Sequence, residues 1–224
     1  MKKLTILAFA AIAMLVSCNK SGDKANTTAE QEVAEQKGQV FTVEADKSTV
    51  KWTGYHKGGL NPRYGVIKTD GTVAVENDAV TGGKFNLDLN SLVTDQAAVD
   101  PVTSGGKTSA DLDAHLKSAD FFDVEKFPTS VFEITSVAAF DATKDTSVLE
   151  GATNVISGNL TIKDKTVNVT FPAKVTMTAE EVHIESKFTI NRQDWGLTYG
   201  TEGDAKDWMI SQEIDVELNI QAKK

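Results

Sequence analysis

The side chains that could catalyse a reaction or bind a metal are few and widely separated in this sequence. The three histidines, His56, His115 and His183, are far apart, and none belongs to a recognisable set of metal ligands. We expect His183 to be solvated on the polar face of a strand, whereas His115 either contacts a ligand head group or packs a short helix. Neither a Gly-X-Ser-X-Gly motif nor a phosphate-binding glycine loop is present. The sequence therefore predicts a protein that binds no metal and is not an enzyme.

One polar cluster, residues 191–196 (NRQDWG), is the strongest candidate for a functional role. Arg192 follows a strand predicted to end near Ile190. Its guanidinium either reaches a ligand at the end of that strand or forms an ion pair with Asp194, and the ion pair is the simpler interpretation. Trp195 either closes one end of the domain as a plug or offers a surface on which a ligand stacks.

The only cysteine, Cys18, indicates covalent lipid attachment. Residues 1–17 contain two lysines followed by an apolar run, which is typical of a secretory signal and too short for a spanning helix. Residues 15–18 (LVSC) resemble the lipobox of bacterial lipoproteins, in which the cysteine carries acyl chains such as palmitate. We therefore predict a signal peptide over residues 1–17 and a lipid anchor at Cys18. The alternative is a signal peptide followed by an incidental cysteine.

Residues 18–39 differ in composition from the rest of the chain. After Cys18 they are mainly Ser, Thr, Ala, Glu, Gln and Lys, with Val33 as the one large apolar residue, and such a segment cannot bury a core. We expect a lipidated N-terminus and flexible tether over residues 18–39 and one folded domain over residues 40–224. The expected route is secretion through the inner membrane, and the expected location is the cell envelope, anchored in the outer membrane facing the periplasm.

The composition is that of a globular, acidic protein. Of 224 residues, 40% are hydrophobic and 25% are charged. The 23 lysines and arginines are outnumbered by 32 acidic residues, which gives a net charge of −9 at pH 7. Because a phosphate backbone requires a basic surface, this balance argues against binding to nucleic acid.

Alternating apolar and polar residues predict the strands. Over residues 155–190 they indicate three antiparallel strands joined by short polar turns. Thr108 or Ser109 is expected to cap a short helix that ends near Lys117. Gly71 is expected to form a bulge within one strand. The same period predicts five more strands, at residues 40–54, 66–76, 80–92, 131–137 and 209–220, which makes eight in total. Polar loops are expected at residues 54–65 and 141–150.

Eight amphipathic strands with one apolar face form either a two-sheet sandwich or a closed barrel. We favour an all-β fold, an eight-stranded antiparallel β-barrel with one short helix in a long loop. A membrane-spanning barrel is excluded because charged residues such as Lys84 and Glu185 occupy the outer face. The interior is either filled by side chains or holds one small ligand. The positions expected to face inward are Val50, Trp52, Phe85, Leu87, Phe132, Ile134, Val169, Phe171, Ile184, Phe188, Val216 and Leu218.

Three segments of the chain resemble one known family. They are residues 114–132 (AHLKSADFFDVEKFPTSVF), 156–171 (ISGNLTIKDKTVNVTF) and 188–200 (FTINRQDWGLTYG). These segments resemble the YceI-like family of secreted, lipocalin-like barrels that bind polyisoprenoid lipids. The resemblance implies a barrel with a long amphiphile, such as an isoprenoid quinone, threaded into its interior. The sequence differs from the simplest members in its lipobox and in residues 56–65.

The resemblance favours a membrane-anchored protein that binds a long-chain apolar lipid for sequestration or transport. No cofactor other than this bound lipid, of isoprenoid type, is expected. The alternative is a non-catalytic interaction protein with a filled barrel, and the oligomeric state, monomer or dimer, stays open. The residues expected to contact the lipid, with the adjacent pair 121–122 at the entrance, are Trp52, Phe85, Leu87, Phe121, Phe122, Phe132, Phe171, Phe188, Arg192 and Trp195.

Overall fold

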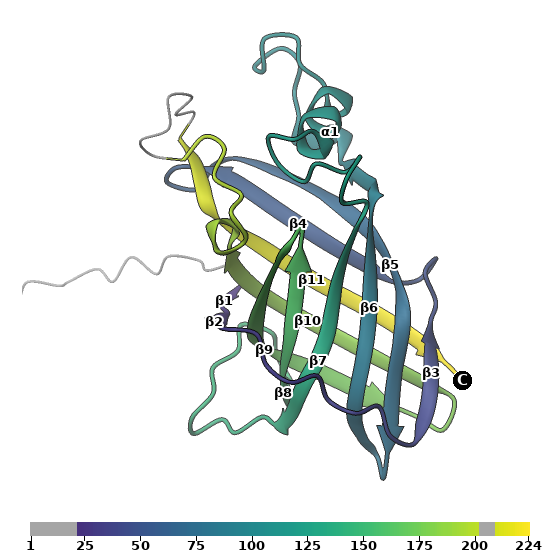
Figure 1. The fold of residues 1–224 in the computed structure, drawn as a ribbon. Coiled ribbons are helices and arrows are strands. Elements are labelled where there is room, and N and C mark those ends of the chain that lie inside the picture. The colour runs from purple at the N-terminus through teal and green to yellow at the C-terminus, as the bar shows by residue number, and fades with distance from the viewer. Residues whose placement is uncertain (1–21, 202–208) are drawn as a thin grey trace, which may run out of the picture.

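Long antiparallel strands wind into a closed barrel in the computed structural model, which describes residues 22–201 and 209–224 (Figure 1). Each barrel strand pairs with the next along the chain, and the last pairs with the first. The prediction of an eight-stranded antiparallel barrel is confirmed. The barrel strands are β4 (Thr49–His56), β5 (Leu60–Glu76), β6 (Ala79–Thr94), β7 (Thr129–Ala139), β8 (Asn154–Ile162), β9 (Lys165–Met177), β10 (Glu181–Asn191) and β11 (Ile210–Lys223).

The period of two in the sequence places apolar side chains inside the barrel. On β10, Val182, Ile184 and Phe188 are all buried in the core. His183, between two of them, lies on the outer face, where its Nε2 is 2.7 Å from Oδ1 of Asn219 on β11. Alternation along each strand thus separates a solvated outer face from a buried inner face.

The first strand and the loop after it differ from the expected pattern. The expected strand over residues 40–54 is divided into β3 (Gln39–Val43) and β4, and both fill the space between β5 and β11. The loop predicted over residues 54–65 is wrong, because β4 continues to residue 56 and β5 begins at residue 60. Only the short turn with left-handed glycines, Gly58 and Gly59, separates these two strands.

The bulge predicted at Gly71 is also wrong. Gly71 stays in the ladder of β5 and β6, opposite Phe85. The register between these strands shifts instead at residues 66–68 and at residues 74–75. Strand β5 is therefore one long strand whose irregularities flank the glycine.

Residues 22–28 form part of the barrel wall. Strands β9 and β10 pair directly only near the turn that joins them. Further along, β1 (Asp23–Lys24) pairs in parallel with β10, and β2 (Asn26–Thr28) pairs antiparallel with β9. Between them Ala25 is buried in the core, and its amide donates to the carbonyl of Thr189 at 2.9 Å. We call this filled space between β9 and β10 the seam.

Residues 29–38 continue across the outside of the barrel from the seam to β3 (Figure 1). Gln31 and Asn159 exchange two hydrogen bonds, at 3.1 and 2.7 Å, and the amide of Ala34 donates to the carbonyl of Ile134 at 3.0 Å. The prediction of a flexible tether is therefore wrong for residues 22–38, which we call the N-terminal strap. Its anchoring depends on backbone pairing and not on the apolar burial that the composition lacks. Cys18 and the predicted signal peptide lie outside the described residues.

One α-helix, α1 (Ser109–Lys117), precedes β7 within the described residues and packs over one end of the barrel (Figure 1). Thr108, one of the two predicted capping residues, is its N-cap and forms a capping box with Asp111. Hydrogen bonds from the backbone and side chain of Thr108 lower the pKa of Asp111. The described part of the chain also contains two short 3₁₀ helices, η1 (Gln96–Ala98) and η2 (Arg192–Trp195). In the part of the chain that the structure describes, no helix has the length and apolar character needed to cross a membrane.

Candidate functional site

A cavity of about 310 Å³ lies inside the barrel, and apolar side chains from all eight barrel strands line most of it. This volume is at the lower end of the range for small-molecule sites. All twelve positions expected to face inward belong to its lining. The barrel is therefore not completely filled by its own side chains.

Nine of the ten side chains that were expected to contact a lipid line this cavity. Their contact with a lipid stays a prediction, but their shared location agrees with it. The nine are Trp52, Phe85, Leu87, Phe121, Phe122, Phe132, Phe171, Phe188 and Arg192.

Four phenylalanines form a continuous aromatic row along the cavity wall. The ring centroids of Phe85 and Phe132 are 6.2 Å apart, and those of Phe132 and Phe171 are 5.7 Å apart. Phe171 and Phe188 are stacked, with centroids 4.2 Å apart and planes at 6°. Gly158 on β8 makes room for this row, because a Cβ there would lie 2.2 Å from Cζ of Phe132. Strands β6, β7, β9 and β10 thus contribute to one continuous apolar surface.

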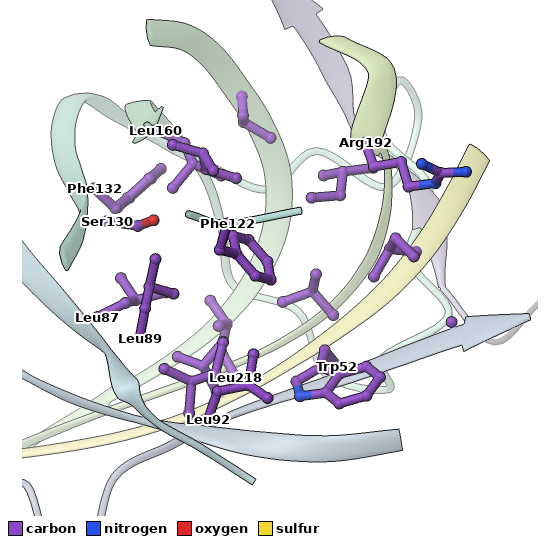
Figure 2. Close-up of a pocket in the computed structure, with 18 of the residues that line it drawn as sticks. Trp52, Leu87, Leu89, Leu92, Phe122, Ser130, Phe132, Leu160, Arg192 and Leu218 are labelled. Atoms are coloured by element: carbon purple, nitrogen blue, oxygen red, sulfur yellow. The ribbon is translucent and has the colours of Figure 1, made fainter. Parts of the chain in front are cut away.

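A second apolar cluster, formed mainly by residues of β4, β5 and β6, also contributes to the wall. Its buried members include Val50, Ile67 and Leu89, with Trp52 packed against them. Phe122 packs against both this cluster and the core that contains the aromatic row. Figure 2 shows its ring in the middle of the cavity lining. Phe122 therefore lies inside the cavity lining, and its expected role at a ligand entrance stays a prediction.

The segment that carries α1 covers one end of the barrel. The ring of His115 contacts Phe121 and Tyr199 edge-on, with centroids 5.2 and 4.7 Å apart. Its Nε2 lies 3.1 Å from Oδ2 of Asp120. His115 is absent from the cavity lining, so the packing alternative holds. The contact with Tyr199 joins the helical segment to the chain that follows η2.

Arg192 is buried and does not form the expected ion pair with Asp194. Its Nε donates to the carbonyl of Ser211 at 3.0 Å, and its other nitrogens donate to the carbonyls of Leu197 and Ile210. Burial lowers the pKa of its guanidinium. Asp194 instead accepts a hydrogen bond from Thr27 in the strap. The guanidinium therefore joins η2 to the start of β11, while its side chain also lines the cavity.

Trp195 differs from its expected role, because it does not line the cavity. Its side chain is buried in the core, and its Nε1 donates to the carbonyl of Leu160 at 2.8 Å. This bond satisfies the indole donor within the protein. Trp195 is thus a core residue and not a stacking surface in the cavity.

Several lining residues were missed in the sequence. Ser130 alternates with Phe132 and Ile134 on β7, so extending the period of two by one step would have found it. Arg63 and His56 also line the cavity, but they fall in the segment that was assigned to a loop. Their positions depend on strand pairing between β4 and β5. The glycines of residues 54–65 favoured a loop and so hid this pairing in the sequence.

The chemistry of the lining is almost entirely apolar. Its side chains include one histidine and no carboxylate. Across residues 22–201 and 209–224, no group of three or more histidine, cysteine, aspartate or glutamate side chains could hold a metal. A closed antiparallel barrel around such a cavity defines the class of lipocalin-like barrels.

Comparison with known proteins identifies the family. The protein-family model described as YceI-like domain matches residues 41–222, and the chain therefore belongs to the YceI-like family. The UPF0312 protein of Pseudomonas aeruginosa is 30% identical over 146 residues, which cover 62% of this chain and 68% of that protein. Protein YceI of Salmonella arizonae is 28% identical over 170 residues, which cover 73% and 75%.

Solved structures share the fold. BcnA of Burkholderia cenocepacia superposes with a TM-score of 0.59 at 19% identity, covering 81% of this chain and 99% of that one. A structure described as a polyisoprenoid binding domain from Saccharophagus degradans, implicated in plant cell wall breakdown, gives a TM-score of 0.54 at 12% identity. It covers 86% of this chain and 99% of that one. At such identities the likeness concerns the fold alone.

Proposed function

We propose that the protein binds a long-chain apolar lipid of the polyisoprenoid type inside its barrel. The apolar cavity enclosed by the eight strands is the observation that carries this proposal. Hydrocarbon that leaves water contributes about 25 cal/mol per Å² to binding. The row of four phenylalanines offers such surface along one wall. A structural neighbour that is described as polyisoprenoid binding supports the same class of ligand.

The proposed role is sequestration or transport and not catalysis. General acid-base chemistry needs proton-transferring groups placed at the reacting atoms. His56 is the one histidine in the lining, and no carboxylate accompanies it there. The alternative role, an interaction protein with a filled barrel, is disfavoured by the cavity.

Native mass spectrometry tests the lipid proposal. A soluble form that lacks residues 1–18 keeps every described residue and can be purified from a bacterial host without detergent. We expect an added mass of one long-chain lipid per chain, which organic extraction releases for identification. A bare protein mass that stays unchanged after incubation with polyprenols and isoprenoid quinones would contradict the proposal.

We also propose that Cys18 is acylated and anchors the protein in the cell envelope. The support is its position after residues 15–17 (LVS) at the end of an apolar run, as the only cysteine of the chain. Expressed as the full chain in bacteria, the protein is expected in the outer-membrane fraction with an acylated N-terminal peptide. Cys18→Ser is expected to abolish both the acylation and the membrane location. An unmodified cysteine in the wild-type protein would contradict this assignment.

A further inference from the structure

Two polar side-chain atoms in the cavity wall have no hydrogen-bond partner among the described residues. They are the hydroxyl oxygen of Ser130 on β7 and the indole nitrogen of Trp52 on β4. Ser130 is 2% exposed, and Figure 2 shows its oxygen turned toward Phe122. The Trp52 nitrogen lies on the edge of the ring that faces Leu218, another lining residue (Figure 2). Such atoms are costly in an apolar wall unless something pairs with them.

A third polar side chain lies in the same layer of the wall. Thr69 on β5 is opposite Leu87 on β6, and Leu87 is opposite Ser130 on β7. Thr69 lines the cavity and is 2% exposed. Among the described residues, its hydroxyl forms only a long bond of 3.4 Å to the carbonyl of Asp70. Two hydroxyls thus flank Leu87, on strands about 10 Å apart.

The cations of the cavity wall are already paired with protein oxygens. Arg63 donates to the carbonyl of Ala98 at 2.6 Å and to the hydroxyl of Ser104 at 3.3 Å. Arg192 donates to three backbone carbonyls, and Figure 2 shows its guanidinium turned away from Phe122. The unpaired polar atoms in the wall are therefore neutral. Neutral donors suit a carbonyl, ester or hydroxyl oxygen, whereas phosphate and carboxylate groups favour charged donors.

We propose that the barrel holds the head group of its lipid as well as the chain, and that this head group is neutral and carries hydrogen-bond acceptors. Trp52 donates to one acceptor, and Ser130, which can donate and accept, pairs with another oxygen. This inference rests on the proposed lipid binding. It adds the orientation of the ligand, because the head then lies inside the barrel against Phe122 and does not project from its end.

Three lipid probes test the head-group preference. They are squalene, which is an isoprenoid hydrocarbon without oxygen, an isoprenoid quinone, and a polyprenyl phosphate. Competition between them for the delipidated soluble form can be measured by native mass spectrometry. We expect the quinone to bind at least about tenfold more tightly than squalene, since two hydrogen bonds each contribute about fivefold. The phosphate is expected to bind more weakly than the quinone.

Ser130→Ala and Trp52→Phe remove the two unpaired groups while keeping the wall apolar. Each is expected to reduce quinone affinity about fivefold more than it reduces squalene affinity. Thr94→Val is the matched control. The Thr94 hydroxyl is also buried without a partner among the described residues, but it does not line the cavity. This control is expected to change neither affinity.

The outcomes distinguish failure of the head-group inference from failure of the proposed lipid binding. Equal affinity for quinone and squalene, or equal losses for both lipids in the variants, would overturn the head-group inference while leaving lipid binding intact. Tighter binding of the polyprenyl phosphate would also overturn it. If none of the three probes binds, the proposed function itself is wrong.

Discussion

Arg192→Met should destabilise the barrel even when no lipid is bound. The guanidinium donates to the carbonyls of Ser211, Leu197 and Ile210, and no described carboxylate forms an ion pair with it. Each hydrogen bond to a charged group contributes about 1.5–3 kcal/mol, so the three together amount to roughly 5–9 kcal/mol. Removing the buried charge recovers several kcal/mol of desolvation free energy. The net loss in unfolding free energy is therefore expected to be about 3 kcal/mol.

Urea denaturation of the delipidated soluble form, followed by tryptophan fluorescence, measures this loss. Lipid must be removed first, because a ligand that binds only the folded state raises its apparent stability. Lys187→Met on β10 is the matched control. Its exposed amine lies 3.5 Å from Glu217, so its loss is expected to cost less than about 1 kcal/mol. Arg192→Lys should recover only part of the stability, since an amine cannot reproduce the fixed, planar set of donors of the guanidinium.

The refuting result is a small effect on stability together with a large effect on binding. If Arg192→Met costs less than about 1 kcal/mol and abolishes lipid binding, the guanidinium acts on the ligand. The assignment of its hydrogen bonds to barrel closure would then be wrong. Full recovery of stability in the lysine variant would point to charge alone and contradict the argument from geometry.

Three further substitutions test other parts of the structure. Gly158→Ala should push the ring of Phe132 into the cavity and weaken lipid binding, with a stability loss of about 1–2 kcal/mol; adding Phe132→Leu should restore binding. Ala25→Asp, which places a carboxylate in the seam, should cost at least about 2 kcal/mol by urea denaturation and expose β9 and β10 amides to hydrogen exchange. Thr108→Ala should cost about 1 kcal/mol and speed exchange in α1. Because the pKa of Asp111 is lowered, its stabilising contribution is present above the ordinary value of 3.8 and is lost as the pH falls below it, which exchange measured against pH will detect.

Each of these predictions has a contradicting outcome. Unchanged binding in Gly158→Ala would show that the Phe132 ring does not limit the cavity. A stable Ala25→Asp protein with protected β9 and β10 amides would show that the seam is not part of the core. Equal exchange of α1 in Thr108→Ala and wild type would mean that the capping box does not stabilise the helix.

The barrel was predictable because its main determinant is local. The inner face of each strand follows from alternation, as at Ile184 and Phe188, and needs no knowledge of which strands are neighbours. The start of α1 was equally local, since Thr108 and Asp111 are three residues apart and satisfy each other. A sequence pattern can identify such features because the interacting groups lie close together in the chain.

The N-terminal strap was missed because its stabilisation is not local. Its residues are polar and short, and the hydrogen bonds of Gln31 and Ala34 go to partners more than 90 residues away in sequence. Asn159 on β8 is the partner of Gln31, yet the period of two identifies Asn159 only as a polar residue on the outer face. Composition therefore predicted a tether where backbone pairing forms a wall.

In the candidate site, too, local features were predictable from the sequence and non-local contacts were not. The phenylalanines of the cavity wall were predictable from alternation, but the role of Arg192 was not. Its three acceptors include carbonyls of β11, which are 18 and 19 residues away in sequence. The near partner, Asp194, instead accepts from Thr27, a contact across 167 residues. A nearby opposite charge is a weak predictor when backbone carbonyls compete for a buried guanidinium.

The seam also links the proposed anchor to the mechanics of the barrel. Cys18 precedes Gly22, the first described residue, by four positions, so the connecting chain spans at most about 14 Å. An acylated Cys18 would hold the edge of β10 at Phe188, beside which β1 pairs, close to the bilayer. The barrel would then have little rotational freedom. Tension between membrane and barrel would act on the hydrogen bonds that keep β9 and β10 bridged, and the wall would separate first at that point.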